Sequence, residues 1–198
     1  MKITSSVFQC SAPDLDSCPP DAVPEFAFIG RSNVGKSSLL NALTGRKGLA
    51  KVSDTPGFTK LINFFMINNT WRLVDLPGYG FAKVARDDKA RFNDAVNEYL
   101  TERDNLAGVF VLIDSGLPPQ KIDLEFVHWL GGQCVPLVLV FTKTDKGSPA
   151  KVHENVEAFK ATMAEWFETL PEIFTCSSVT RHGLHELLTA IDGTIAPA

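Results

Sequence analysis

The sequence GRSNVGKS at residues 30–37 lies between a short apolar run, residues 26–29, and a segment with helical periodicity, residues 36–44. It matches the pattern G-x-x-x-x-G-K-[ST], which wraps phosphate groups between a strand and a helix. Its glycines allow backbone N–H groups and the helix N-terminus to face phosphate oxygens. We therefore expect Lys36 to reach the β- and γ-phosphates and the Ser37 hydroxyl to bind magnesium. A plain glycine turn is the weaker alternative, because a chance match is expected on the order of one time in a hundred.

Strand-like and helix-like segments alternate along the chain. Expected strands lie at residues 26–29, 61–67, 71–76, 108–113, 135–141 and 173–176, and expected helices at residues 36–44, 87–103, 121–130, 150–170 and from residue 182 onward. Asn68 and Asn69 join two of the strands, and asparagine tolerates the positive φ of a tight turn, so we expect one antiparallel pair there. Uniformly apolar strands separated by helices predict a doubly wound α/β fold, with a mostly parallel sheet, one antiparallel strand and helices on both faces.

Length and composition favour a single domain. The chain has 198 residues, 44% hydrophobic and 21% charged, which is enough to bury a core. Because residues 11–24 are rich in proline, we expect an N-terminal extension and loop at residues 1–23 and one domain at residues 24–198. No apolar run approaches the roughly 18 residues of a membrane span. The start of the chain lacks the features of a secretory signal, so a cytoplasmic protein is expected. Four cysteines without a C-x-x-C pair favour free thiols.

The net charge of −4 is unevenly distributed. Residues 1–103 carry 13 Lys and Arg against 11 Asp and Glu, whereas residues 104–198 carry 6 against 12. Basic residues concentrate in two clusters, one formed by Arg46, Lys47, Lys51 and Lys60 and the other by Lys83, Arg86, Lys89 and Arg91. An ordinary solvated surface is one interpretation, and contact with nucleic-acid phosphates is the other. The overall charge excludes only indiscriminate coating of nucleic acid.

The sequence DLPG at residues 75–78 follows an expected strand, where ligands bind in doubly wound sheets. In this position the Asp75 carboxylate can hold magnesium through water, and the Gly78 N–H can sense a γ-phosphate. An aspartate in an ordinary turn is the alternative, which the preceding phosphate-loop sequence makes less favourable.

The sequence TKTD at residues 142–145 follows another expected strand. Asp145 can accept two hydrogen bonds from the N1–H and exocyclic amine of guanine, which adenine cannot offer, and the Lys143 stem can lie over the base. This pattern favours GTP over ATP. Ser177 and Ser178 follow the last expected strand, where backbone N–H groups can meet the guanine O6; a helix cap is the alternative.

Residues 53–59, SDTPGFT, fit a switch segment, which needs a hydroxyl that joins the magnesium ion when the γ-phosphate is present. Thr59 is the expected hydroxyl and Thr55 the rival. Lys36, Thr59 and Gly78 are the expected catalytic residues, and Ser37 and Thr59 the expected metal ligands.

The ordered set GRSNVGKSSLLNAL, TPGFT, DLPGYGFAKV, TKTD and CSS resembles the EngB (YihA/YsxC) family of bacterial GTPases, from about residue 24 to the end. The resemblance implies a Ras-like P-loop GTPase domain, Mg²⁺-dependent GTP hydrolysis, a role in large ribosomal subunit assembly, and a requirement for normal division and septation. It places the nucleotide on Gly30, Arg31, Ser32, Asn33, Val34, Gly35, Lys36 and Ser37, on Gly57, Phe58, Thr59, Lys60 and Leu61, on Asp75, Leu76, Pro77 and Gly78, on Thr142, Lys143, Thr144 and Asp145, and on Cys176, Ser177 and Ser178.

Two residues refine the expected mechanism. Tyr79 stands where many small GTPases keep a glutamine that orients the attacking water, so slow intrinsic hydrolysis is expected; packing of Tyr79 against the switch segment is the alternative. Asn33 lies inside the phosphate loop, where related GTPases with asparagine use potassium as a counter-charge; a turn residue that tolerates unusual φ is the alternative.

Three functions remain open from the sequence. The first is a monomeric nucleotide switch whose GTP state binds a large-subunit precursor and its rRNA, because both basic clusters flank the expected switch segments. The second is an ATP-using P-loop enzyme. The third is a division scaffold that binds nucleotide without significant turnover.

Overall fold

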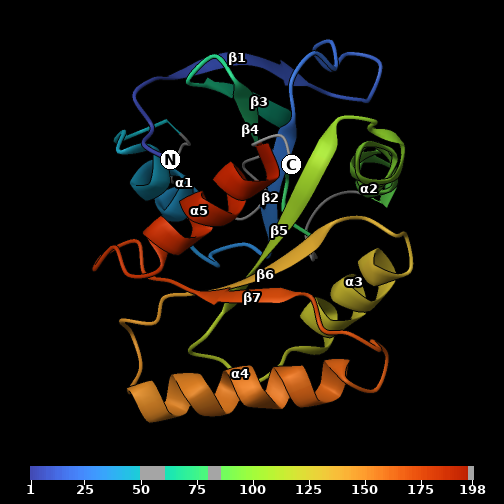
Figure 1. The fold of residues 1–198 in the computed structure, drawn as a ribbon. Helices are drawn as coiled ribbons and strands as arrows, with labels where there is room; N and C mark the ends of the chain where they lie inside the picture. Colours follow the sequence, from blue (N-terminus) through green and yellow to red (C-terminus); the bar gives the residue numbers. More distant parts are fainter. Residues whose placement is uncertain (50–60, 80–85, 196–198) are drawn as a thin grey trace.

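A seven-stranded sheet in the order β1-β3-β4-β2-β5-β6-β7 forms the centre of the molecule (Figure 1). The structure is a computed structural model and describes residues 1–49, 61–79 and 86–195, with only the backbone described for residues 86–93. The elements are β1 Ser6–Ala12, β2 Glu25–Gly30, α1 Lys36–Thr44, β3 Ile62–Ile67, β4 Trp71–Asp75, α2 Arg86–Glu102, β5 Leu106–Asp114, α3 Lys121–Gly131, β6 Leu137–Thr142, α4 Pro149–Met163, β7 Glu172–Thr175 and α5 Leu184–Ile195. No helix in these ranges is long and apolar enough to cross a membrane.

The strand directions confirm the expected α/β fold. β2 pairs in parallel with β4 and β5, and β6 pairs in parallel with β5 and β7. β3 is the strand that runs against the others, and it joins β4 through Asn68 and Asn69, whose φ angles are 50° and 58°. The parallel strands therefore end at one edge of the sheet, where the predicted nucleotide-binding sequences follow them.

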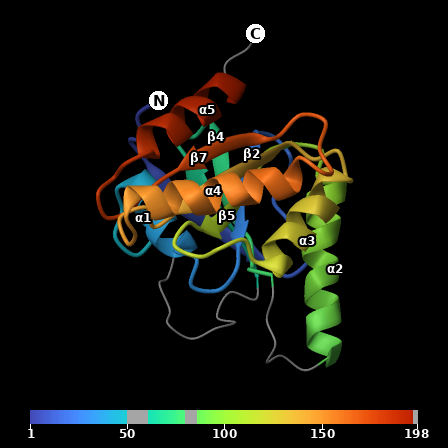
Figure 2. The ribbon, with the colours of Figure 1, turned by 90° about the horizontal axis from the view of Figure 1, so that it is seen from below.

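Side-chain alternation along the strands builds a hydrophobic core on each face of the sheet. On one face Ala27 and Ile29 of β2 join a cluster that includes residues of α2, α3 and α4. On the other face Phe26 and Phe28 join a cluster with residues of α1 and α5. Figure 2, viewed from below, shows α4 in front of the sheet with α3 beside it. Helices thus cover both faces, as the apolar strands predicted.

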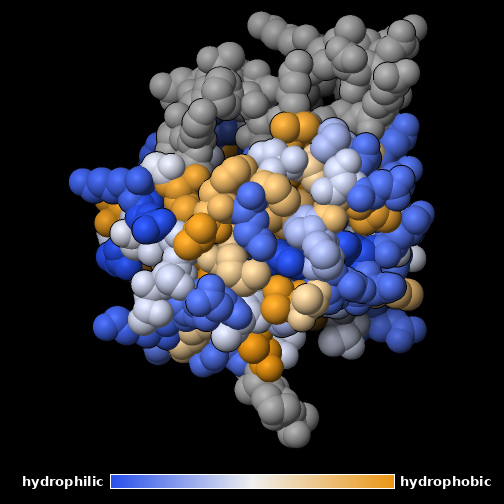
Figure 3. All heavy atoms as spheres, turned by 90° about the horizontal axis from the view of Figure 1, so that it is seen from above, coloured by the Kyte–Doolittle hydropathy of each residue, from blue (hydrophilic) through white to orange (hydrophobic). Residues whose placement is uncertain are grey.

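Strand β1 was not expected from the sequence, which favoured an extension and loop over residues 1–23. Residues Ser6–Ala12 instead pair with β3, giving a second antiparallel pair where only one was expected. Val7 and Phe8 are exposed, and in Figure 3 hydrophobic residues gather in the middle of the upper face, where β1 lies. Because β1 is an edge strand with three consecutive exposed residues, it lacks the alternation that marks a half-buried strand. The assignment of residues 24–198 to a single domain stays a prediction.

Helix α4 ends at Met163, seven residues before the expected end at residue 170. Phe167 instead turns toward α3, since a Cβ atom placed on Gly131 would lie only 2.4 Å from its ring. Its ring takes part in the core between these helices. This tertiary packing explains the early end of the helix, because contacts with other elements override local helix propensity.

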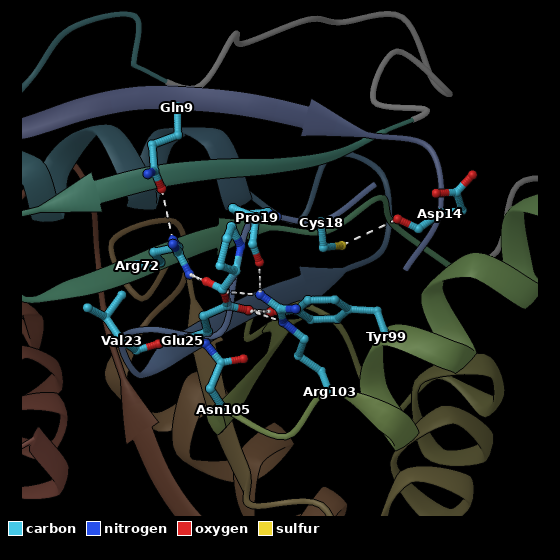
Figure 4. Close-up of polar contacts among 11 residues, drawn as sticks. Gln9, Asp14, Cys18, Pro19, Val23, Glu25, Arg72, Tyr99, Arg103 and Asn105 are labelled. Carbon is cyan, nitrogen blue, oxygen red and sulfur yellow. Dashed lines mark hydrogen bonds and ion pairs between the residues drawn. The ribbon is translucent and has the colours of Figure 1, made fainter. Parts of the chain in front are cut away.

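A buried polar cluster joins the N-terminal segment to the sheet at the end remote from the predicted nucleotide-binding sequences (Figure 4). Its centre is Glu25, the first residue of β2, which is fully buried. The Glu25 carboxylate accepts hydrogen bonds from Arg72 at 2.9 Å, from Arg103 at 2.8 and 3.0 Å, and from the Tyr99 hydroxyl at 2.9 Å. Arg72 and Arg103 also donate to the carbonyls of Pro20 and Pro19. The two arginines therefore hold the loop before β2 in place through hydrogen bonds to the backbone carbonyls of that loop.

Candidate functional site

The phosphate-loop sequence forms a tight connection between β2 and α1. Gly35 precedes α1 with a φ of 98°, and Asn33 has a φ of 63°, both in the left-handed region. Gly35 is the N-cap residue of α1 and has no side chain that could cap the helix. The first N–H groups of α1 therefore receive no hydrogen bond acceptor from a capping side chain. This geometry suits an anionic ligand at the helix start. The positive φ of Asn33 is the conformation that the turn interpretation of this residue predicts.

Lys36 joins the phosphate loop to the DLPG sequence. Its ammonium group forms an ion pair with Asp75 and donates to the Leu76 carbonyl at 2.6 Å. Gly78 lies against the phosphate loop, because a Cβ atom added to it would stand 2.4 Å from the Gly30 carbonyl oxygen. Residues from two separate predicted sequences thus meet at one edge of the sheet, and Gly78 requires the absence of a side chain for this approach.

The TKTD sequence contacts the phosphate loop from the other side. Thr142 donates from its hydroxyl to the Val34 carbonyl at 2.6 Å. The Lys143 ammonium donates to the Asn33 carbonyl at 2.5 Å and pairs with Asp114, the last residue of β5, at 2.6 Å. The Lys143 stem passes over Gly35, with its Cε atom 3.7 Å from a Cβ placed there. The loop expected to read the base is therefore fixed to the loop expected to bind phosphates.

Asp145 and Ser177 come together across the sequence. The Ser177 hydroxyl donates to the Asp145 carboxylate at 2.6 Å and accepts from the N–H groups of Val179 and Thr180, both at 3.1 Å. The backbone N–H of Ser177 donates to the His182 carbonyl at 3.0 Å. Of the two N–H groups expected to face guanine O6, that of Ser177 thus already has an acceptor, and its hydroxyl has an orienting role that the sequence did not suggest.

Cys176 takes part through its backbone. Its side chain is fully buried in the core beneath α1 and α5, and its carbonyl accepts from the Thr144 N–H at 3.3 Å. It therefore connects the two loops beside the expected base site without presenting its thiol to a ligand.

Tyr79 packs against α3, whereas the packing interpretation placed it against the switch segment, residues 53–59, which lies outside the described residues. Its hydroxyl donates to the Asp123 carboxylate at 2.8 Å, and its ring stacks on Phe126 with a centroid separation of 4.2 Å. The same Asp123 oxygen accepts from the Arg31 Nε at 2.8 Å. Asp123 was not among the expected site residues. Its only sequence signal is an acidic residue in the first turn of an expected helix, which usually serves the helix dipole.

Several expected site residues lie outside the described ranges. These are Gly57, Phe58, Thr59 and Lys60, together with the rival Thr55. In the basic clusters, Arg46 and Lys47 have described side chains, and both are exposed, whereas Lys51, Lys60 and Lys83 are outside these ranges and Arg86, Lys89 and Arg91 have only a described backbone. Arg46 donates to the Ser6 carbonyl of β1.

Both tyrosines of the chain should resist ionisation while the protein is folded. Burial first, and then the neighbouring carboxylate, raise the pKa of Tyr79 beside Asp123 and that of Tyr99 beside Glu25 well above the usual value of 10.0. As the pH rises past the usual tyrosine pKa of 10.0, the unfolded chain releases phenolic protons that the folded chain keeps. The free energy of unfolding should therefore fall as the pH rises further.

An alkaline titration followed by tyrosinate absorbance and circular dichroism tests this expectation, with free tyrosine amide as reference. We expect tyrosinate to form only together with the loss of secondary structure. Ionisation of either tyrosine at the pH of the reference compound, in a protein with an unchanged circular dichroism spectrum, would contradict it.

Comparison with known sequences agrees with this geometry. A family model described as 50S ribosome-binding GTPase matches residues 25–143. A probable GTP-binding protein EngB of Bacteroides fragilis is 49% identical over 192 residues, which cover 97% of this chain and 96% of that protein. A probable GTP-binding protein EngB of Christiangramia forsetii is 48% identical over 193 residues, with 98% of each chain covered.

Solved structures show the same arrangement of helices and strands. The crystal structure of a probable GTP-binding protein EngB matches with a TM-score of 0.67 and 26% identity, covering 86% of this chain and 98% of that one. Era in complex with MgGDPNP and nucleotides 1506–1542 of 16S ribosomal RNA matches with a TM-score of 0.70 and 25% identity, covering 89% of this chain and 58% of that one. The fold is thus that of P-loop GTPases.

Proposed function

The chain belongs to the EngB family of GTP-binding proteins, and from this premise we propose that it is a slow, Mg²⁺-dependent GTPase that acts as a switch in large ribosomal subunit assembly. The observation that carries the proposal is the convergence of the phosphate loop, the DLPG sequence and the TKTD sequence at one sheet edge, linked by Lys36 and Lys143. In this proposal GTP and GDP are the ligands, and the protein works as a monomer in the cytoplasm.

The proposed reaction uses the chain's own groups mainly for positioning. The Lys36 ammonium, which lies between Asp75 and the Leu76 carbonyl, would neutralise charge on the β- and γ-phosphate oxygens. The Gly78 N–H would donate to the γ-phosphate and so distinguish GTP from GDP. Asp145, held by Ser177, would accept from the guanine N1–H and amine.

The residues at this edge fit a magnesium ion. Ser37 is the second residue of α1 and Asp75 ends β4, and hydroxyl and carboxylate oxygens are the donors that Mg²⁺ prefers. In the part of the chain that the structure describes, no group of three His, Cys, Asp or Glu residues could hold a metal by itself. Such a site suits an ion held largely by substrate phosphates and water. When bound, Mg²⁺ would neutralise phosphate charge, and Thr59 is proposed as its second protein ligand.

Slow intrinsic hydrolysis is proposed from the environment of Tyr79. Its hydroxyl donates to Asp123 and its ring stacks on Phe126, so the phenol is engaged away from an attacking water. A partner would then complete the catalytic site. We propose the ribosomal precursor and its rRNA as that partner, because the basic clusters flank the switch segments in sequence and a similar GTPase, Era, has been crystallised with ribosomal RNA.

Multiple-turnover phosphate release, measured with and without large-subunit precursor particles, tests the proposed function. We expect slow release by the protein alone and faster release with particles, weakening as salt is raised because phosphate contacts are screened. Lys36→Ala is the matched control that should abolish both rates. Binding of nucleotide without any particle-dependent turnover would favour a division scaffold instead, while the division and septation role itself needs a depletion experiment in cells.

Potassium as an accessory ion is part of the proposal, through Asn33. The same release assay compares potassium with sodium at matched ionic strength, and Asn33→Gly keeps the positive φ while removing the side-chain amide. Faster turnover in potassium that Asn33→Gly abolishes is expected, and equal turnover in the two salts would exclude the role of potassium.

A further inference from the structure

One oxygen atom of Asp123 joins two segments of the proposed nucleotide site to α3. Its Oδ1 accepts from the Arg31 Nε and from the Tyr79 hydroxyl, each at 2.8 Å. Arg31 is the second residue of the phosphate loop, and Tyr79 directly follows the DLPG sequence. Asp123 is 1% exposed, so both contacts are shielded from water, which strengthens hydrogen bonds to a charged group.

The second Asp123 oxygen, Oδ2, is buried and has no hydrogen-bond partner in the part of the chain that the structure describes. A buried carboxylate oxygen without a donor costs stability. Such under-satisfied groups in native structures are rare and concentrate at sites where function rather than stability selects the residue.

Gly78 lies between the phosphate loop and the residue that Asp123 binds, Tyr79. On one side Gly78 approaches the Gly30 backbone so closely that a Cβ atom would stand 2.4 Å from the carbonyl oxygen. On the other side the next residue, Tyr79, is fixed to α3 by its hydrogen bond to Asp123 and by its stacking on Phe126. The backbone at Gly78, whose N–H is proposed to sense the γ-phosphate, is thus held by one contact at its own α-carbon and by another at the next residue.

We propose that Asp123 is a positioning residue for γ-phosphate recognition: by binding Arg31 and Tyr79 with one oxygen, it sets the Gly78 N–H relative to the phosphate loop. This inference rests on the proposed function, because it takes Gly78 as the group that senses the γ-phosphate. GDP has no γ-phosphate, so loss of the contact between Tyr79 and Asp123 should weaken binding of GTP and its analogues while leaving GDP affinity unchanged. A purely structural role would affect both nucleotides alike.

Tyr79→Phe is the most direct variant, because it removes the hydroxyl and keeps the ring that stacks on Phe126. Titration calorimetry with GDPNP and with GDP should show a loss of about tenfold in GDPNP affinity, the effect of losing one hydrogen bond to a charged group, and no change for GDP. Equal losses for both nucleotides, or no loss for either, would overturn the inference.

A double-mutant cycle tests whether Tyr79 acts through Asp123. Asp123→Ala should lower the affinity for GDPNP at least as much as Tyr79→Phe does. The double variant should bind GDPNP no more weakly than Asp123→Ala alone. Additive losses would overturn the coupling. Glu125→Ala is the matched control, since this carboxylate lies exposed on the same helix and should change neither affinity.

Failure of the inference can be separated from failure of the proposed function. If the unaltered protein binds no GDPNP, the proposed function is overturned together with the inference. If it binds GDPNP and releases phosphate from GTP while Tyr79→Phe changes neither affinity, only the role of Asp123 is overturned.

Discussion

Replacement of Asp145 by asparagine is expected to convert a guanine-binding site into a xanthine-binding site. The Asp145 carboxylate accepts from the Ser177 hydroxyl at 2.6 Å, which orients it beside the loop that follows β7. A carboxylate in this position can accept two hydrogen bonds from guanine. An asparagine amide presents a donor instead, which pairs with the additional carbonyl oxygen of xanthine and opposes the guanine amine.

The expected size of this change is large. Loss of two hydrogen bonds to a charged group should lower the affinity for GTP by about a hundredfold or more, and the affinity for XTP should rise by a comparable factor. Competition against a fluorescent guanine nucleotide measures both. Ser177→Ala should cost only about tenfold and keep the guanine preference, because it removes the orienting hydroxyl rather than the acceptor.

The control for this experiment is Glu154→Gln, an acid-to-amide change on the exposed face of α4 that should alter neither affinity. Retention of guanine preference by Asp145→Asn would contradict the assigned base site. A wild-type preference for ATP over GTP would favour the alternative of an ATP-using enzyme.

Glu25→Ala is expected to have the largest effect on stability. The side chains of Arg72 and Arg103 are only 5% and 10% exposed. Removal of the Glu25 carboxylate leaves both buried guanidinium groups without their anionic partner. Breaking a buried ion pair in this way typically costs about 3–5 kcal/mol of unfolding free energy. The loop at Pro19 and Pro20 should loosen as well, since both arginines hold its carbonyls.

Urea unfolding of the Glu25→Ala protein measures this loss. Glu98→Ala is the matched control, since it removes a carboxylate from an exposed position of α2 and should change stability by less than about 0.5 kcal/mol. A loss below about 1 kcal/mol for Glu25→Ala would contradict the prediction, because it would mean that the two arginines are stabilised by other partners or by water.

The sheet was predictable from the sequence because its central strands are uniformly apolar. Phe26, Phe28 and their neighbours bury against helices on both faces, and that pattern is visible without a structure. Strand β1 was not predictable, since Val7 and Phe8 are exposed in succession and the residues of β3 that pair with it lie at least fifty positions along the chain. The end of α4 depended on a tertiary contact between Phe167 and Gly131.

The candidate site was likewise predictable only in part. The phosphate loop, DLPG and TKTD were identified because each is a contiguous pattern with a defined place after a strand. The contacts that connect them join residues that are distant in sequence: Lys143 with Asn33, Ser177 with Asp145, and Tyr79 with Asp123. No local pattern encodes such pairs. Asp123 in particular looks like any acidic residue in the first turn of a helix.

The position of β1 at the sheet edge also has a consequence for the order in which the chain folds during synthesis. Ser6 pairs opposite Ile67, so β1 cannot pair until β3 has been synthesised. Glu25 waits longer still for Arg103, which lies 78 positions later. Strand β1 and Glu25 therefore reach their final contacts only after much of the chain that follows them has been synthesised, and Val7 and Phe8 are still exposed once β1 has paired.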